Sequence, residues 1–196
     1  MKRLFLLGPI LFTVVVIVLT IVQYDFLLGL GWDLIKAPTL DWPSGLSLGP
    51  YGLWMIATFI VTGFALFFFA LHLRADLKPA PASRIGSIAL ACSGFCMAGL
   101  AFTTDPTLRP GPHTWHGILH DTAFVLVGLS LLISMFFLGK AFQNDPRWRG
   151  YGIYTWITAA FAIPSFFLKG AAFYFFLLAV LVWNEVIAIR LVKIES

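Results

Sequence analysis

The stretch Tyr51–Leu71 reads YGLWMIATFIVTGFALFFFAL and contains no charged residue. At about 1.5 Å of rise per residue, a helix of this length crosses the roughly 30 Å of hydrocarbon in a bilayer. Inside lipid the backbone must satisfy its own polar groups, which a helix does internally. The stretch therefore predicts a transmembrane helix.

Similar apolar runs stand before and after this stretch. The predicted spans are residues 4–22, 51–71, 85–102, 116–138, 151–168 and 171–189. The first run is longer than the roughly 7 to 15 apolar residues of a cleavable signal peptide, so we expect it to be a retained span. We predict an all-α integral membrane bundle of six transmembrane helices, forming a single domain over residues 1–196.

Composition excludes an ordinary soluble domain. The chain is 60% hydrophobic and 11% charged, with a mean hydropathy of +0.91, whereas soluble domains carry about 25% charged residues. The net charge is +4, but the basic residues are scattered at the ends of the apolar runs and form no basic stripe. We therefore expect the lipid bilayer as the partner and no binding of nucleic acid.

Basic residues predict the orientation, because cytoplasmic loops of membrane proteins carry an excess of Lys and Arg. If the N-terminus is cytoplasmic, the inner segments hold ten basic residues: Lys2, Arg3, Arg74, Lys78, Arg84, Lys140, Arg147, Arg149, Arg190 and Lys193. The outer segments then hold three: Lys36, Arg109 and Lys169. We predict that both termini are cytoplasmic and that the protein resides in the cell membrane, plasma or inner.

The connections between the spans differ in character. The inner loops, 72–84 and 139–150, are short, contain proline and are typical of solvated turns. The outer connection, 23–50, is the long one, and its tryptophans and leucines make it too apolar for a free loop. We expect it to lie against the membrane face or to cap the bundle.

Two cysteines, Cys92 and Cys96, lie four residues apart in the third predicted span. A framework of disulfides is therefore excluded. We interpret the pair as small packing residues that, with Ser93, Gly94 and Gly99, let helices approach closely. A thiol contribution to a metal site is the alternative.

A polar cluster surrounds the turn between the third and fourth predicted spans. His113, His116 and His120 fall within eight residues, and Asp121 follows directly. Because His116 and His120 are four residues apart, a helix places their imidazoles on one face, at metal-ligand spacing. Asp105 ends the third span and must emerge near the start of the fourth. The candidate site therefore comprises these five residues and faces outward.

Three interpretations of this cluster remain open. A divalent metal such as zinc is the first, held by His116, His120 and Asp105, because a helix N-terminus favours the neutral imidazole that binds metals. A proton relay or polar ligand site is the second, since Asp105 and Asp121 attract protons to nearby histidines. A structural role is the third: Asp105 caps its turn, and His120 and Asp121 bond between helices.

Glu185 is a secondary candidate in the inner part of the sixth predicted span. A carboxylate near hydrocarbon is costly, so we expect it to snorkel inward, to pair with Arg84 or Arg190, or to couple to protons. The phenylalanine-rich stretches 67–69 and 173–176 are typical of lipid-facing or interhelical packing, and their bulk is also compatible with an acyl-chain groove.

Three short motifs carry a resemblance to a known family. They are LSLGPYG at 46–52, TDP at 104–106 and HGILHD at 116–121. In these motifs and in its order of spans, the chain resembles the prokaryotic membrane-protein family catalogued as domain of unknown function 998. The resemblance implies a small multi-pass membrane protein and brings no established activity or cofactor. It marks Asp105 and His120 as a paired feature.

Three functions of different classes follow. The first is an accessory or sensing protein that assembles with other membrane proteins or with copies of itself. The second is a metal-dependent membrane-embedded hydrolase or lipid-modifying enzyme, with a metal-activated water and Asp121 as base or supporting residue. The third is a small transporter, for which polar residues would extend inward along Ser130, Ser134 and Glu185. We favour the first, and the sequence leaves enzymatic activity open.

Overall fold

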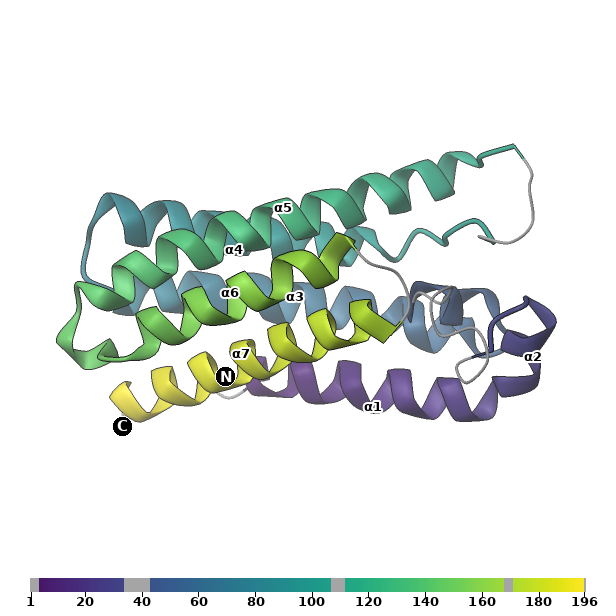
Figure 1. Cartoon of the computed structure of the whole chain (residues 1–196), viewed down its shortest axis with the longest axis horizontal. Helices are drawn as coiled ribbons and strands as arrows, with labels where there is room; N and C mark the ends of the chain where they lie inside the picture. The colour runs from purple at the N-terminus through teal and green to yellow at the C-terminus, as the bar shows by residue number, and fades with distance from the viewer. Residues whose placement is uncertain (1–3, 34–42, 107–111, 168–170, 196) are drawn as a thin grey trace.

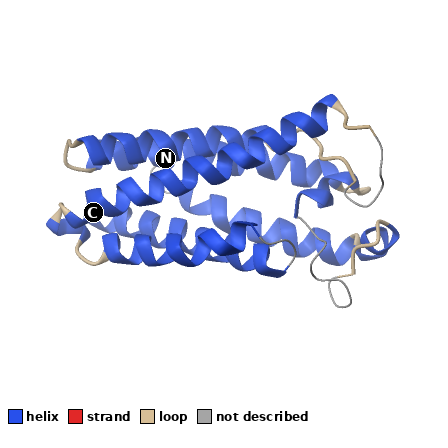
Figure 2. Cartoon of the chain, turned by 45° about the horizontal axis from the view of Figure 1, so that its top comes forward, coloured by secondary structure: helices blue, strands red, loops and turns tan. Residues whose placement is uncertain are grey.

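The computed structural model of the chain describes residues 4–33, 43–106, 112–167 and 171–195. These residues form helices joined by turns, and they contain no β-strand (Figure 2). The predicted all-α class is confirmed. Residues 34–42, the middle of the long connection, lie outside the described residues. So do five basic residues used to predict the orientation: Lys2, Arg3, Lys36, Arg109 and Lys169.

A helix lies at each of the six predicted spans. The long helices are α1 (Leu7–Val22), α3 (Gly52–Asp76), α4 (Pro81–Gly99), α5 (Trp115–Gln143), α6 (Tyr151–Phe167) and α7 (Ala171–Glu195). The short ones are η1 (Leu4–Leu6), α2 (Tyr24–Gly29), η2 (Pro43–Leu48) and η3 (Pro146–Trp148). Several helices continue beyond their apolar runs, because helical backbone remains favourable in polar surroundings.

Four of these helices are long and apolar enough to cross a membrane: Gly52–Asp76, Pro81–Gly99, Trp115–Gln143 and Phe173–Ile194. Among the described residues, α1 and the segment Tyr151–Ile163 of α6 are apolar but shorter. Large apolar side chains also cover the outside of the bundle; Leu53 is 79% exposed and Phe95 is 67% exposed. Lipid rather than water suits such a surface, so the chain is a membrane protein.

The long helices run along one axis, with successive helices in opposite directions (Figure 1). In the order α1, α3, α4, α5, α6 and α7, each packs against the next, and α7 returns to contact α1 and α3. The bundle thus closes around an interior. We call the end that carries α2, η2 and the α4–α5 connection the capped end, and the end that carries the α3–α4 and α5–α6 connections the charged end (Figure 1).

Glycine brings α3 and α4 into backbone contact. A Cβ on Gly63 would lie 2.5 Å from the amide nitrogen of Ala98 and 2.7 Å from the carbonyl oxygen of Gly94. A Cβ on Gly94 would lie 2.6 Å from the amide nitrogen of Phe67. The expectation of close helix packing is confirmed for Gly94, whereas Cys92, expected to pack beside it, is exposed. Small residues are the usual means of such contact in membranes, where lipid tails compete with apolar side chains.

The first long connection caps one end of the bundle in its described parts. Gln23 holds both sides of it: its Nε2 donates to the carbonyl of Leu46 at 3.1 Å, and its Oε1 accepts from the amide of Tyr51 at 2.9 Å. Trp32 is 3% exposed and packs against Gly45, where a Cβ would overlap the indole ring. The prediction of a capping connection is confirmed for these residues.

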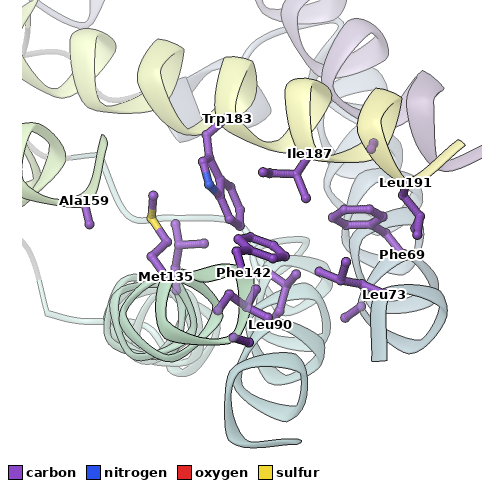
Figure 3. Packing of buried hydrophobic residues seen from close by; sticks show 14 of the residues in the cluster. Phe69, Leu73, Leu90, Met135, Phe142, Ala159, Trp183, Ile187 and Leu191 are labelled. Atoms are coloured by element: carbon purple, nitrogen blue, oxygen red, sulfur yellow. The ribbon is translucent and has the colours of Figure 1, made fainter. Parts of the chain in front are cut away.

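Large apolar side chains fill the interior toward the charged end (Figure 3). Trp183 and Phe142 are fully buried, and the ring of Phe142 stacks on that of Trp148 with centroids 4.6 Å apart. The indole nitrogen of Trp183 donates to Thr155 Oγ1 at 2.9 Å. This bond satisfies a polar group that would be costly to bury alone.

A hydrogen-bond network around Arg147 secures the charged end. Its guanidinium donates to Asp145 Oδ2 at 2.7 Å and to Asp76 Oδ1 at 3.0 Å. Arg190 donates to the carbonyl of Arg147 at 3.1 Å, and the indole of Trp148 donates to Asp76 Oδ2 at 3.3 Å. The expectation of a solvated turn at 139–150 is therefore wrong, because this loop ties the ends of α3 and α7 together.

Candidate functional site

Asp105 and Thr114 join the segment after α4 to the start of α5. Thr114 is the N-cap residue of α5, and its Oγ1 accepts a hydrogen bond from the amide of Gly117 at 3.1 Å. Asp105 accepts from the amide of Thr114 at 2.9 Å and from its hydroxyl at 2.6 Å. A Cβ on Gly117 would overlap Asp105 Oδ2, so glycine is required there. The carboxylate and the cap thus form one unit.

The surroundings of Asp105 favour its charged form. Hydrogen bonds from the hydroxyl and the amide of Thr114 lower the pKa of Asp105 and outweigh the opposing effect of desolvation, and His116 and His113 add smaller effects in the same direction as the hydrogen bonds. His113 is 78% exposed, with Nδ1 4.0 Å from Asp105 Oδ2. Asp105 is therefore an anion at neutral pH that organises the turn.

His116 lies beside this unit and contacts the end of the α4 segment. Its Nδ1 is 2.8 Å from the carbonyl oxygen of Thr103 and 3.0 Å from Thr114 Oγ1. Because a carbonyl oxygen can only accept, Nδ1 carries the hydrogen, and Nε2 holds the lone pair of the neutral ring.

His120 lies one turn further along α5 and is 4% exposed. Its Nδ1 is 2.7 Å from the carbonyl oxygen of Phe102 and 3.1 Å from that of Leu100, so this nitrogen is also the donor. Both carbonyls belong to the segment that follows α4, where helical backbone bonding has ended. The ring packs edge-on to Phe59, with centroids 6.3 Å apart.

The five candidate residues do not converge on one point. Asp105 and His120 bond to different partners, and Asp121 is exposed on α5. Within the described part of the chain, no three His, Cys, Asp or Glu side chains are grouped closely enough to hold a metal ion. Each of His116 and His120 has one ring nitrogen bonded to backbone carbonyls. Nε2 of each ring remains the nitrogen that a metal would use, so the zinc hypothesis stays a prediction.

An apolar cavity of about 110 Å³ lies inside the bundle. Its walls come from α1, α3, α4, α5 and α7, with η2 at the capped end. Phe12, Phe59, Phe124 and Leu177 are among the side chains that line it. His120 also lines the cavity, and among the described lining residues its side chain is the titratable one. The buried face of the predicted cluster is thus part of a cavity wall.

Few other polar groups line this cavity. Ser93 Oγ donates to the carbonyl of Val127 at 3.3 Å, and Thr62 Oγ1 donates to the carbonyl of Thr58 within its own helix. Asn184 lines the cavity as well, and its Oδ1 is buried without a hydrogen-bond partner. A buried polar atom without a partner is costly, so Asn184 Oδ1 is an unsatisfied acceptor beside the cavity.

The residues expected along a transport path do not form a continuous polar line. Ser130 Oγ donates to the carbonyls of Leu126 and Val127 within its own helix. Ser134 Oγ and Glu185 Oε2 are buried without partners. Arg190, an expected partner of Glu185, instead bonds to the carbonyl of Arg147.

Sequence reasoning missed the cavity and the role of Thr114. The cavity collects residues from five helices, and no local pattern predicts which faces of these helices meet. Thr114 carried a recognisable signal, because a threonine directly before a long apolar run is a common N-cap. Its bonds to Asp105 link positions nine apart across the turn and depend on the tertiary structure.

Comparison with known proteins gives a family without an assigned activity. A family model described as "Protein of unknown function (DUF998)" matches residues 6–191. No curated protein and no solved structure matches the chain.

Proposed function

The chain belongs to the DUF998 family of unknown function, and because that description names no reaction, we propose a function from the geometry of the chain. The protein is an accessory or sensing protein of the cell membrane that binds the apolar chain of a lipid-like molecule in its interior cavity. The observation that carries this proposal is an apolar cavity with His120 in its wall.

The proposed topology has six membrane passes and both termini in the cytoplasm. Six long helices in alternating directions support six passes (Figure 1). Basic residues at the charged end support the orientation, since cytoplasmic ends carry the excess of Lys and Arg. They are Arg74, Lys78, Arg84, Lys140, Arg147, Arg149, Arg190 and Lys193. The capped end, with the cluster at Asp105, then faces outward.

Cysteine accessibility tests this topology in a Cys92→Ala/Cys96→Ala background. Pro112 is exposed at the capped end and Lys78 is exposed at the charged end. A membrane-impermeant maleimide added to intact cells is expected to label Pro112→Cys and to leave Lys78→Cys unlabelled until the cells are opened. Labelling of Lys78→Cys alone from outside would invert the topology.

The form of the cavity favours a single extended chain. Its lining residues on α7 run from Phe173 to Asn184, and those on α5 run from His120 to Leu131. Each of these stretches extends about 16 Å at 1.5 Å per residue. A volume of about 110 Å³ over that length is narrow, and apolar cavities of roughly this volume stay dry and accept small apolar molecules.

His120 gives this cavity a polar side near the capped end. Because its Nδ1–H is bound to the Phe102 and Leu100 carbonyls, the ring is held in one orientation, and Nε2 remains to accept a hydrogen bond. A ligand with a hydroxyl or carboxyl group at one end of its apolar chain fits this arrangement. Such pockets typically combine apolar walls with a few oriented polar groups.

A photoreactive analogue of palmitic acid tests the proposal. The full-length protein in detergent micelles is expected to form a saturable adduct with a diazirine-bearing palmitic acid, and excess palmitic acid should prevent it. Val180→Phe fills the cavity and should abolish saturable labelling. Val182→Phe is the matched control, because Val182 lies on the same helix but is 48% exposed.

The role of His120 has a separate test. His120→Asn retains a donor near the position of Nδ1 and removes the free ring nitrogen. This variant should remain folded and should bind palmitic acid more weakly, while labelling by a diazirine-bearing alkane without a head group stays unchanged.

If Val180→Phe and Val182→Phe are labelled equally by the palmitic acid analogue, the cavity is not the binding site and the proposal fails.

A further inference from the structure

A second apolar feature lies on the outer surface between α3 and α4, apart from the interior cavity. A groove of about 360 Å³ is lined by Phe67 and Leu71 of α3 and by Ile88, Cys92 and Phe95 of α4. Ile88 is 42% exposed and Phe95 is 67% exposed, so the groove opens toward the surrounding medium. In a bilayer that medium is lipid, and the groove suits a hydrocarbon chain lying along the two helices.

A basic depression of about 700 Å³ adjoins this groove at the charged end, and Arg74 lines both. Arg84, in the first turn of α4, lines the depression as well. Both arginines are exposed, and neither has an ion pair or hydrogen bond with the residues that the structure describes. Their guanidinium groups are therefore available to an anion at the mouth of the groove.

The turn between α3 and α4 fixes the shape of this depression. Pro79 and Pro81 line it, and Ser83 closes the turn through bonds to the amide of Ala80 at 3.0 Å and to the carbonyl of Lys78 at 2.8 Å. The prolines and the hydrogen-bonded Ser83 limit the conformations of the turn, so binding of a ligand costs little conformational entropy there.

Ser87 of α4 lies in the apolar groove, near the basic depression. It lines the groove, it is 1% exposed, and its Oγ is buried without a hydrogen-bond partner. Because this oxygen is buried beneath the groove wall, the surface that faces an acyl chain is almost entirely apolar.

We infer that the α3–α4 face binds an anionic phospholipid. Its phosphate lies between Arg74 and Arg84, and one acyl chain follows the groove past Ser87 toward Phe95. Charge complementarity selects the anionic head group, because guanidinium groups donate paired hydrogen bonds to phosphate oxygens. This site differs from the interior cavity in position, in charge and in ligand, so either can fail without the other.

Native mass spectrometry of the delipidated full-length protein tests this inference. Dioleoyl phosphatidylglycerol should bind more tightly than dioleoyl phosphatidylcholine. Arg74→Gln/Arg84→Gln should weaken phosphatidylglycerol binding about tenfold and leave phosphatidylcholine binding unchanged. Lys140→Gln/Arg149→Gln removes the same charge from the same end and should bind like wild type. Equal losses in the two double variants would overturn the inference in favour of a diffuse charge effect.

Two further measurements test the apolar half of this site. Cys92→Trp fills the groove and should weaken binding of both lipids at least about fivefold, whereas Leu129→Trp, at a position 52% exposed on α5, should not. Glycerol 3-phosphate should fail to displace phosphatidylglycerol at equal concentration. Full displacement by this head group, or an unchanged affinity in Cys92→Trp, would overturn the acyl-chain assignment, provided that the variants unfold at the wild-type temperature.

Discussion

Thr114 is the residue on which the capped end depends. Its hydroxyl accepts from the amide of Gly117 and donates to Asp105, so a single group completes the helix cap and holds the carboxylate. Thr114→Val keeps the shape and removes both bonds. We expect it to lower the free energy of unfolding by about 1–2 kcal/mol, measured by thermal unfolding in detergent. Thr114→Ser should restore most of this loss.

Asp105 should make stability depend on pH in the acid range. Its pKa is lower in the folded protein than in the unfolded chain, because Thr114 donates to the carboxylate. The stabilisation is complete above the ordinary carboxyl pKa of about 4 and is lost as the pH falls through the folded value. Between about pH 5 and pH 3, wild type should lose more stability than Asp105→Asn. Parallel losses would show that the folded state does not favour the carboxylate.

The helices were predictable as elements, whereas their lateral contacts were not. Uninterrupted apolar runs such as 51–71 identify helices, because a bilayer demands both length and internal backbone bonding. The same runs are apolar on all sides, so they do not show which side faces a neighbouring helix. The contact of Gly63 with Gly94 illustrates this point, since an added Cβ at Gly29 or Gly150 would meet nothing within 4 Å.

The contact between α3 and α4 should tolerate no added methyl group. Gly63→Ala would normally stabilise a helix by up to about 1 kcal/mol. Here its Cβ would meet backbone atoms of Gly94 and Ala98, which cannot rotate away. We expect a net loss of about 1–3 kcal/mol, seen as a lower unfolding temperature. Gly29→Ala is the control, because nothing lies within 4 Å of that Cβ.

The charged end joins elements that are distant in sequence, and Arg147 is its centre. Asp145 is 1% exposed, and the bond from the Arg147 guanidinium lowers the pKa of Asp145. Arg147→Gln should cost about 1–3 kcal/mol in the free energy of unfolding, less than a fully buried pair, because the Arg147 side chain is 40% exposed. Arg149→Gln, a neighbouring exposed arginine, should change stability little. Equal effects would exclude a specific network.

In the whole molecule, the structure of the candidate site differs from its sequence-based prediction more than the fold does. The histidine spacing correctly drew attention to the start of α5, yet it could not show that His116 and His120 bond to backbone carbonyls. Nor could it show the cavity behind His120, because residues from several helices line it. Trp183 belongs both to the packed core shown in Figure 3 and to the wall of this cavity.

Peptide mapping of the palmitic acid adducts tests whether the fatty acid binds in the interior cavity, because it reports where the acyl chain lies. We expect saturable adducts on residues that line the cavity, such as Met97, Phe124 and Leu177. Adducts confined to outward-facing residues of α7, such as Leu178 at 55% and Val182 at 48% exposure, would contradict it. Such a result would show that the chain lies against the outside of the bundle.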